Sequence, residues 1–260
     1  MPGESTPTRV QDRVDANGLI TYYEALGAGE PLALLHGGFC TVETFAGLAP
    51  LLAERYRVIM PERRGHGRTP DVEGPITYEL MAQDTIAFLD ALGVSAVHLV
   101  GWSDGAMVAL LMAMQRPDLA RTLVMIGQPV NLNGIQPEMI GMLQMESMPD
   151  MLPPMLEETY AAVSPEGPEH WAVVKDKLWQ MIRTEPTLEL RELETVDIPT
   201  LLIVADHDFA TLEHEQAMQQ AFPDARLEVV PNATHGLPME QPEVVSRLVL
   251  DFLETASSGD

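Results

Sequence analysis

The stretch "GWSDGAM", residues 101–107, decides the fold class of this 260-residue chain. It follows the apolar run 96–100, which has the length of a buried strand, and it leads into 106–115, whose pattern predicts a helix. A turn between a strand and a helix normally needs one glycine, whereas this turn has two, placed on either side of Ser103. The spacing therefore predicts a tight turn that presents the serine side chain to a site.

Strand-like and helix-like segments alternate along most of the chain. Short apolar runs bounded by Gly, Pro, Asn or Asp predict buried strands at 32–35, 57–60, 97–100, 123–126, 201–205 and 227–230. Helical patterns lie between them at 45–55, 78–92, 106–115, 212–222 and 242–254. Because such alternation implies right-handed crossovers, we expect an α/β fold: a mostly parallel sheet with helices on both faces.

The ends of the chain differ from this pattern. Residues 9–24 contain two short alternating segments split by Ala16-Asn17-Gly18, which predicts an antiparallel hairpin at one edge of the sheet. Residues 256–260 are small and polar, and we expect them to be disordered.

The alternation stops between about Pro129 and Pro199. This segment is rich in proline, has no strand-like run, and carries methionines at positions 139, 142, 145, 148, 151 and 155. We expect residues 129–197 to form a helical cap over the carboxyl ends of the strands, inserted into a core made of residues 1–128 and 198–260. The methionines could line an adaptable apolar pocket or form the core of the cap, and the sequence leaves both open.

The serine of the tight turn predicts nucleophilic catalysis. Gly-x-Ser-x-Gly between a strand and a helix is the nucleophile elbow, and a serine hydroxyl needs a base that a carboxylate orients. Asp206 and Asp208 follow the predicted strand 201–205, and His235 follows the next one. We therefore expect a triad of Ser103, His235 and Asp208, since Asp208 lies deeper in its loop, with Asp206 as the alternative acid.

Acyl transfer also requires backbone N–H donors for the oxyanion. The sequence His36-Gly37-Gly38-Phe39 follows a predicted strand and can supply one of them. We favour Gly38 as this donor, with Phe39 second, and we expect the N–H of Asp104 to be the other. His36 is expected to hold the loop and not to take part in catalysis.

Residues beside the nucleophile are the candidates for substrate binding. Trp102 either walls the pocket or packs against the sheet, and Phe39 follows the oxyanion loop glycines. The Asp104 carboxylate either binds an ammonium group on the acyl part of a substrate or stabilises the start of its helix. Cys40, the single cysteine, is expected to be a packing residue in a reducing compartment.

Composition limits the partners of the protein. A formal net charge of −24 argues against nucleic acid and anionic membrane surfaces. The sequence has no bilayer-spanning apolar run and no basic-then-apolar start, so we expect a cytoplasmic protein that acts on a small molecule. We expect neither a metal nor a cofactor, because the histidines show no ligand spacing and no dinucleotide fingerprint is present. Monomer and homodimer both remain open.

Five stretches carry a family resemblance. They are "LALLHGGF" (32–39), "RRGHGRT" (63–69), "LVGWSDGA" (99–106), "LLIVADHDF" (201–209) and "NATHGLPMEQP" (232–242). Together they resemble the α/β-hydrolase superfamily, in its branch of small capped serine hydrolases and carboxylesterases, and the elbow is similar to that of valacyclovir-hydrolase-like enzymes. The resemblance implies an eight-stranded sheet with the active site beneath the cap. One departure is "MPERRG" (60–65), where relatives more often carry Asp-x-Arg-Gly.

The predicted activity is hydrolysis of carboxylic esters with small to medium apolar groups, through an acyl-enzyme on Ser103. The same triad also supports lactone hydrolysis, carbon–carbon hydrolysis and perhydrolysis, so these alternatives stay open. An epoxide hydrolase or a haloalkane dehalogenase is disfavoured, because both would need Asp at position 103. The alternative of another class is a receptor-like homologue that binds a ligand with little turnover.

Overall fold

A computed structural model describes residues 9–257 of the chain. Its centre is an eight-stranded sheet in the order β1-β2-β4-β3-β5-β6-β7-β8. The strands are β1 (Val10–Ala16), β2 (Leu19–Leu26), β3 (Pro31–Leu35), β4 (Arg57–Pro61), β5 (Val97–Trp102), β6 (Ala120–Ile126), β7 (Thr200–His207) and β8 (Ala225–Thr234). β2 pairs with β1 and β4 in antiparallel fashion, and every other neighbouring pair is parallel. The prediction of a mostly parallel, eight-stranded sheet is confirmed.

The predicted edge hairpin is present as β1 and β2. Asn17 and Gly18 connect the two strands, and both have positive φ, at 55° and 74°. A two-residue hairpin turn of this kind favours Asn-Gly because asparagine and glycine tolerate the left-handed region.

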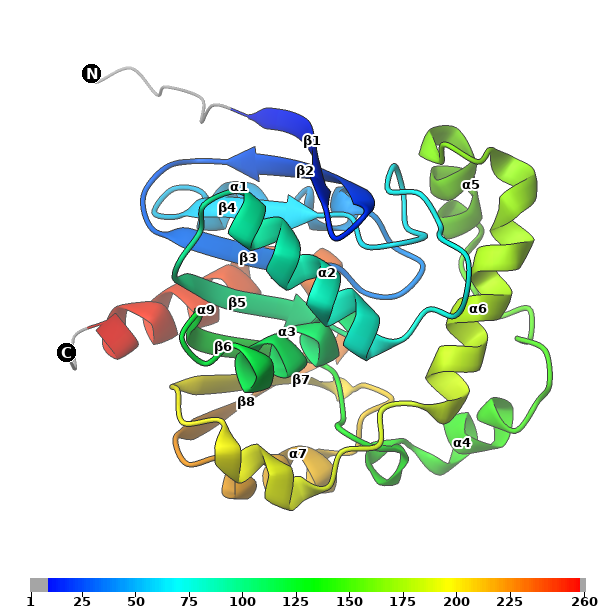
Figure 1. Cartoon of the computed structure of the whole chain (residues 1–260). Coiled ribbons are helices and arrows are strands. Elements are labelled where there is room, and N and C mark those ends of the chain that lie inside the picture. Colours follow the sequence, from blue (N-terminus) through cyan, green and yellow to red (C-terminus); the bar gives the residue numbers. More distant parts are fainter. Residues whose placement is uncertain (1–8, 258–260) are drawn as a thin grey trace.

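Helices cover both faces of the sheet (Figure 1). α2 (Tyr78–Ala91), α3 (Asp104–Gln115) and α7 (Leu212–Ala221) lie on one face, and α1 (Leu48–Leu52) and α9 (Pro242–Ser257) lie on the other. Side chains of each strand alternate between the two faces. In β3, for example, Ala33 and Leu35 enter the core beneath α2 and α3, whereas Leu32 and Leu34 enter the core beneath α1 and α9.

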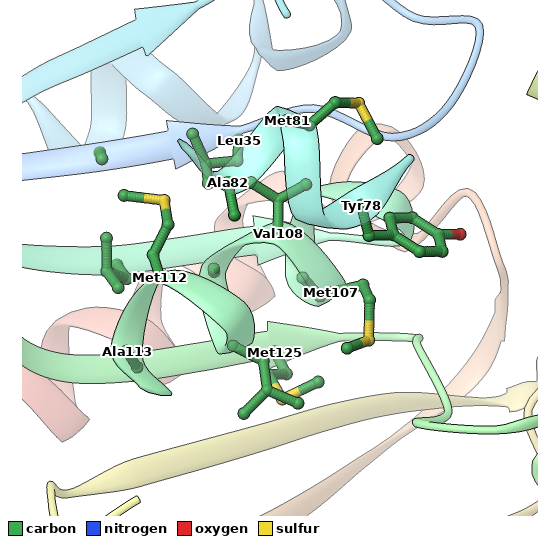
Figure 2. Close-up of a cluster of buried hydrophobic side chains, with 14 of the residues drawn as sticks. Leu35, Tyr78, Met81, Ala82, Met107, Val108, Met112, Ala113 and Met125 are labelled. Carbon is green, nitrogen blue, oxygen red and sulfur yellow. The ribbon is translucent and has the colours of Figure 1, made fainter. Parts of the chain in front are cut away.

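The core beneath α2 and α3 holds the start of α3 in place (Figure 2). Val108 and Met112 of α3 are completely buried, as are Met81 and Ala82 of α2. Methionine fits irregular gaps well, and it recurs here where the two helices meet the strands. This packing fixes the helix that begins directly after Ser103.

Three α-helices lie between β6 and β7, at the sheet edge where the parallel strands end (Figure 1). They are α4 (Pro137–Leu143), α5 (Pro154–Val163) and α6 (Trp171–Thr184), with 3₁₀ turns at Leu132–Gly134, Pro168–His170 and Leu190–Thr195. No strand of the sheet comes from this segment, although isolated bridges occur at Asn131 and Ile135. The bounds 129–197 for a separate cap remain our prediction.

Two details of the sequence prediction were wrong. The helix expected at 45–55 is a 3₁₀ turn at Val42–Phe45 followed by the short α1. Residues 256 and 257 belong to the last turn of α9 and not to a disordered tail, while 258–260 lie outside the described residues. The remaining helix is the short α8 (Leu237–Glu240). No helix in the described part of the chain is long and apolar enough to cross a membrane.

Candidate active site

Ser103 lies in a strained turn between β5 and α3. Its backbone has φ 54° and ψ −129°, a conformation that residues other than glycine rarely adopt. A Cβ on Gly101 would overlap the carbonyl oxygen of Gly105, and a Cβ on Gly105 would overlap that of Leu35. Both glycines are therefore required, because the helix starts directly against the neighbouring backbone. This is the tight turn that the two glycines predict.

Three predicted site residues meet at this turn. His235 Nε2 lies 3.0 Å from Ser103 Oγ, and His235 Nδ1 lies 2.9 Å from Asp208 Oδ1. Because an ionised carboxylate only accepts, Nδ1 carries the ring proton and Nε2 is free to take the serine proton. Asp208 is buried, and its Oδ1 also accepts the backbone N–H of Phe209 at 2.7 Å. The geometry is that of a nucleophile, a base and an orienting acid.

Asp206 does not touch His235. Its carboxylate accepts the backbone N–H groups of Asn232 at 2.9 Å and Ala233 at 3.1 Å. These two hydrogen bonds lower the pKa of Asp206. The side chain thus joins the end of β7 to the segment that leads to His235.

The His235 ring is enclosed by neighbours that the sequence did not single out, apart from Trp102. The Phe209 ring centroid lies 4.4 Å from that of His235, and the Trp102 centroid lies at 5.4 Å. Trp102 Nε1 also donates to the backbone carbonyl of His235 at 2.8 Å. Gly127 has φ 63°, and a Cβ there would lie 2.7 Å from Asp208 Oδ2. In the sequence, the only indication of a role for Gly127 is that it directly follows the predicted strand 123–126.

The loop after β3 lies against the nucleophile. A Cβ on Gly37 would come within 3.3 Å of Ser103 Cβ, and a Cβ on Gly38 would overlap Asp104 Oδ2. Phe39 follows with φ 62°, and its ring packs edge-on against Trp171 of α6, with the centroids 6.0 Å apart. The structure therefore brings Gly38, Phe39 and the first residue of α3 to one side of Ser103. Their roles as oxyanion donors remain predictions.

Asp104 is fully buried beside the nucleophile. Its Oδ1 accepts the hydroxyl of Tyr78 at 2.7 Å, while Oδ2 has no hydrogen-bond partner among the described residues. Burial raises the pKa of Asp104, and the Tyr78 hydroxyl and the Arg63 charge oppose that effect. Tyr78 was not predicted, because nothing near it in the sequence indicates a contact with Asp104.

The loop at 60–65, which departs from the family pattern, is tightly packed. Glu62 is completely buried, and it accepts the backbone N–H of Arg68 at 2.5 Å and its guanidinium at 2.7 Å. A Cβ on Gly67 would overlap the Glu62 carboxylate. The turn at Gly67 thus leaves room for Glu62, whose side chain is longer than the Asp of the family pattern. Burial raises the pKa of Glu62 to about 7.

A cavity of about 950 Å³ leads from Ser103 and His235 to the helices between β6 and β7. Its lining is mostly apolar. The helical segment contributes Ile135, Met139, Leu143, Met148, Met151, Leu152, Met155, Leu156, Trp179 and Ile182, and the sheet side contributes Phe39, Trp102, Phe209 and Met239. Four of the six methionines between residues 139 and 155 therefore lie on the cavity wall.

Two further observations concern reactive groups. Cys40 also lines the cavity, but burial raises the pKa of its thiol to about 11, so it is protonated at neutral pH. Within residues 9–257, no group of three His, Cys, Asp or Glu side chains is placed to hold a metal ion. Ser103 is thus the nucleophile candidate that has a base within reach.

The chain is similar to several known hydrolases. Mouse (Mus musculus) sn-1-specific diacylglycerol lipase ABHD11 is 27% identical over 275 residues, covering 94% of this chain and 88% of the lipase. The 2-hydroxy-6-oxo-6-phenylhexa-2,4-dienoate hydrolase of Burkholderia cepacia is 26% identical over 253 residues, covering 87% of this chain and 88% of that enzyme. A solved serine hydrolase involved in carbazole degradation, the CarC enzyme, shares the fold with a TM-score of 0.80. It is 23% identical and covers 95% of this chain and 100% of its own. The model of the alpha/beta hydrolase family matches residues 32–248, so the chain belongs to that family.

Proposed function

We propose that this protein is a serine hydrolase that cleaves carboxylic esters through an acyl-enzyme on Ser103. The observation that carries the proposal is the continuous hydrogen-bonded path from Ser103 Oγ through His235 to Asp208, at the floor of an apolar cavity. The reaction uses no metal or cofactor. We place the enzyme in the cytoplasm. The sequence leaves open whether it is a monomer or a homodimer.

The proposed reaction begins when His235 Nε2 takes the proton of Ser103 as Oγ attacks the ester carbonyl. The oxyanion then receives hydrogen bonds from the N–H groups of Gly38 and Asp104, with Phe39 as the second choice to Gly38. Asp208 stabilises the imidazolium ion. His235 next protonates the departing alcohol, and water hydrolyses the acyl-enzyme by the same route.

The cavity supports a substrate with a medium-sized apolar group. Its volume of about 950 Å³ lies near the upper end for small-molecule sites, and a short acyl group would leave most of it unfilled. Methionine side chains adapt to ligands of irregular shape. Phe39 and Trp102 line the cavity near the nucleophile, and we propose that both contact the substrate.

Lactones and carbon–carbon bonds are alternatives on the same triad, as is perhydrolysis. The relative from Burkholderia cepacia is named for hydrolysis of a dienoate, whereas the mouse relative is named as a lipase. The two relatives are thus named for different reactions, although their sequence identities to this chain are similar, at 27% and 26%. The assay therefore has to include both kinds of substrate.

A second candidate is an ester that carries an ammonium group. Two of the four carboxylates on the cavity wall are the buried Asp104, whose Oδ2 has no partner among the described residues, and Glu185, which accepts the backbone N–H of Tyr78 at 3.1 Å. Burial raises the pKa of both acids, and the Asp104 charge adds to the effect on Glu185. A substrate cation would offset this unfavourable environment. Loss of activity on phenylalanine esters but not on apolar esters in Asp104→Asn would support this candidate.

The test is hydrolysis of p-nitrophenyl esters from acetate to decanoate, by wild type and Ser103→Ala in parallel. We expect a rate maximum at intermediate chain length and loss of turnover in the variant. A phenylalanine ester, a lactone and a dienoate share the plate. Equal turnover by Ser103→Ala would contradict the proposal, and a wild type that hydrolyses only another substrate would move that reaction ahead. Binding without any turnover would favour the receptor-like alternative.

A further inference from the structure

Two adjacent arginines in "RRGHGRT" lie buried near the active site but have different partners. Arg64 Nε forms an ion pair with Asp84 at 2.6 Å. Among the described residues, none of the ion pairs includes Arg63, and its Nε and Nη1 have no hydrogen-bond partner. A buried cation without a carboxylate partner is costly. The partner of the remaining side-chain nitrogen therefore shows which group the guanidinium stabilises.

That nitrogen, Arg63 Nη2, lies 3.2 Å from His36 Nδ1 and 3.1 Å from the carbonyl oxygen of Gly37, to which it donates. The tautomer of His36 supports this assignment. The backbone N–H of Arg63 donates to His36 Nε2 at 3.3 Å, so the ring proton is on Nδ1, which lies 2.7 Å from the same Gly37 oxygen. Burial lowers the pKa of His36 well below its usual value, so the ring is neutral. The Gly37 carbonyl thus accepts two hydrogen bonds, one of them from a cation.

The carbonyl of Gly37 and the N–H of Gly38 are opposite ends of one planar peptide group. A hydrogen bond at the carbonyl polarises the group and strengthens its N–H as a donor. We propose that Arg63 is a positioning residue that holds and polarises the Gly37–Gly38 peptide for the oxyanion of the reaction. This inference rests on the proposed function, because only there does the Gly38 N–H meet an oxyanion.

The charge of Arg63 acts in the same direction. Asp104 is the acid that most favours the charged form of Arg63, although the two do not form an ion pair. Burial lowers the pKa of Arg63 to about 10, so the guanidinium is charged at neutral pH. When the oxyanion forms, a second negative charge appears near this buried cation, where water screens charges weakly. The attraction is greater in the transition state than in the ground state, so it increases kcat.

The test compares Arg63→Met and Arg63→Lys with the matched control Arg64→Met. Each variant is assayed for kcat and KM on a p-nitrophenyl ester and for inhibition by a trifluoromethyl ketone with the same acyl chain. In the inhibited enzyme, Ser103 Oγ bonds to the ketone carbon, the serine proton moves to His235 Nε2, and the carbonyl electrons become the oxyanion. A thermal melt of each variant reports stability separately.

We expect Arg63→Met to lose kcat and ketone affinity by the same factor, about 10- to 100-fold, with KM nearly unchanged. Arg63→Lys, which keeps the charge, is expected to recover part of both. Arg64→Met removes an ion pair of similar burial, so it should lower the Tm and leave kcat and ketone affinity within about threefold.

The inference is overturned if Arg63→Met changes only the Tm, as the control does. If Arg63→Met does not fold, Arg63→Gln provides the same comparison without the charge, and there we expect a loss of about tenfold in both quantities. A wild type that neither hydrolyses the ester nor binds the ketone would instead contradict the proposed function. The two failures are therefore distinguishable.

Discussion

At Ser103, side chains from three distant segments meet through two hydrogen bonds of 2.9 and 3.0 Å. The sequence could predict Ser103, Asp208 and His235 because each directly follows a strand of a parallel sheet, and such strands end at the same edge. The choice of Asp208 over Asp206 followed only from its depth in the loop. The structure gives the physical difference, since one carboxylate contacts the His235 ring and the other contacts backbone N–H groups.

The two acids provide a matched pair for mutation. We expect Asp208→Asn to reduce kcat by about 10³- to 10⁴-fold, because the amide no longer selects the productive tautomer of His235. Asp206→Asn is expected to change kcat less than about threefold, since Asp206 contacts the backbone of the loop and the exposed His207 ring but not His235. Steady-state kinetics on one p-nitrophenyl ester measures both. Equal losses in the two variants would show that the assignment of the acid is wrong.

Glu215 predicts an unusual pH dependence of stability. It is buried in α7, its Oε1 has no hydrogen-bond partner among the described residues, and burial together with the Asp208 charge raises its pKa to about 8. The unfolded chain releases this proton near pH 4.5, whereas the folded protein holds it until about pH 8. Because the folded state then binds more protons, the free energy of unfolding falls as pH rises between these values.

Glu215→Gln removes this titration. We expect the variant to gain about 1–3 kcal/mol relative to wild type when pH is raised from 5 to 9, or a Tm difference that grows by several degrees. Thermal melts of both proteins at the two pH values measure the change. Parallel pH curves would show that Glu215 is already ionised in the folded protein at neutral pH.

Other residues of the site could not be predicted, because they act through contacts between segments that are far apart in the sequence. Gly127 is needed because its φ is positive and because Asp208 and His235 occupy the space where its Cβ would be. Tyr78 was expected simply as the first residue of a helix, yet its hydroxyl reaches Asp104. Arg63 lies in "MPERRG", where the sequence shows a departure from the family pattern but nothing that indicates a contact with Gly37. No local pattern encodes such contacts.

At the scale of elements, the crossing of β5 and α3 constrains the site most strongly. Gly105 contacts the backbone of Leu35 so closely that a Cβ would require the helix or β3 to move. We expect Gly105→Ala to destabilise the protein by several kcal/mol and to reduce activity, because the movement displaces Ser103. The matched control is Gly141→Ala in α4, where a Cβ meets nothing within 4 Å.

Gly141→Ala is expected to be neutral or to stabilise the protein by up to about 1 kcal/mol, since alanine favours helix more than glycine does. Urea unfolding of both variants measures the difference. If Gly105→Ala were as stable as Gly141→Ala, the close crossing of α3 over the strands would be wrong.

Elements with a clear hydrophobic pattern were predicted well, and short elements were not. The strands β3 to β8 and the helices α2, α3, α7 and α9 were each expected close to where they occur. The segment around α1 was expected as one helix, but Thr41 to Gly47 must also form the wall of the cavity, and the chain turns there. Tertiary packing outweighs local helix propensity in such a short segment.

At the scale of the whole molecule, one acid joins the core to the helices between β6 and β7. Asp71, in the loop after β4, is nearly buried and accepts hydrogen bonds from Lys177 Nζ at 2.7 Å and His170 Nε2 at 2.9 Å. Lys177 also donates to the carbonyl of Val72 at 2.8 Å. These contacts attach the N-terminal half of α6 to the loop after β4.

We expect Asp71→Asn to weaken this attachment, which would lower stability by about 1–3 kcal/mol and increase protease cleavage within residues 129–197. Asp118→Asn is the control, because Asp118 pairs with Arg116 at the exposed surface and should have little effect. Limited proteolysis with mass spectrometry locates the cuts. Identical digestion of the two variants would show that Asp71 does not secure the helices.

The central claim is that Ser103 is a nucleophile activated by His235, and labelling by a fluorophosphonate tests it most directly. Intact and peptide mass spectrometry would follow wild type, Ser103→Ala and His235→Ala over time. We predict one label per wild-type chain, located on Ser103, no label on Ser103→Ala, and labelling of His235→Ala slowed by at least about 10³-fold. A folded wild type that takes no label, or a Ser103→Ala variant that is still labelled, would contradict the account.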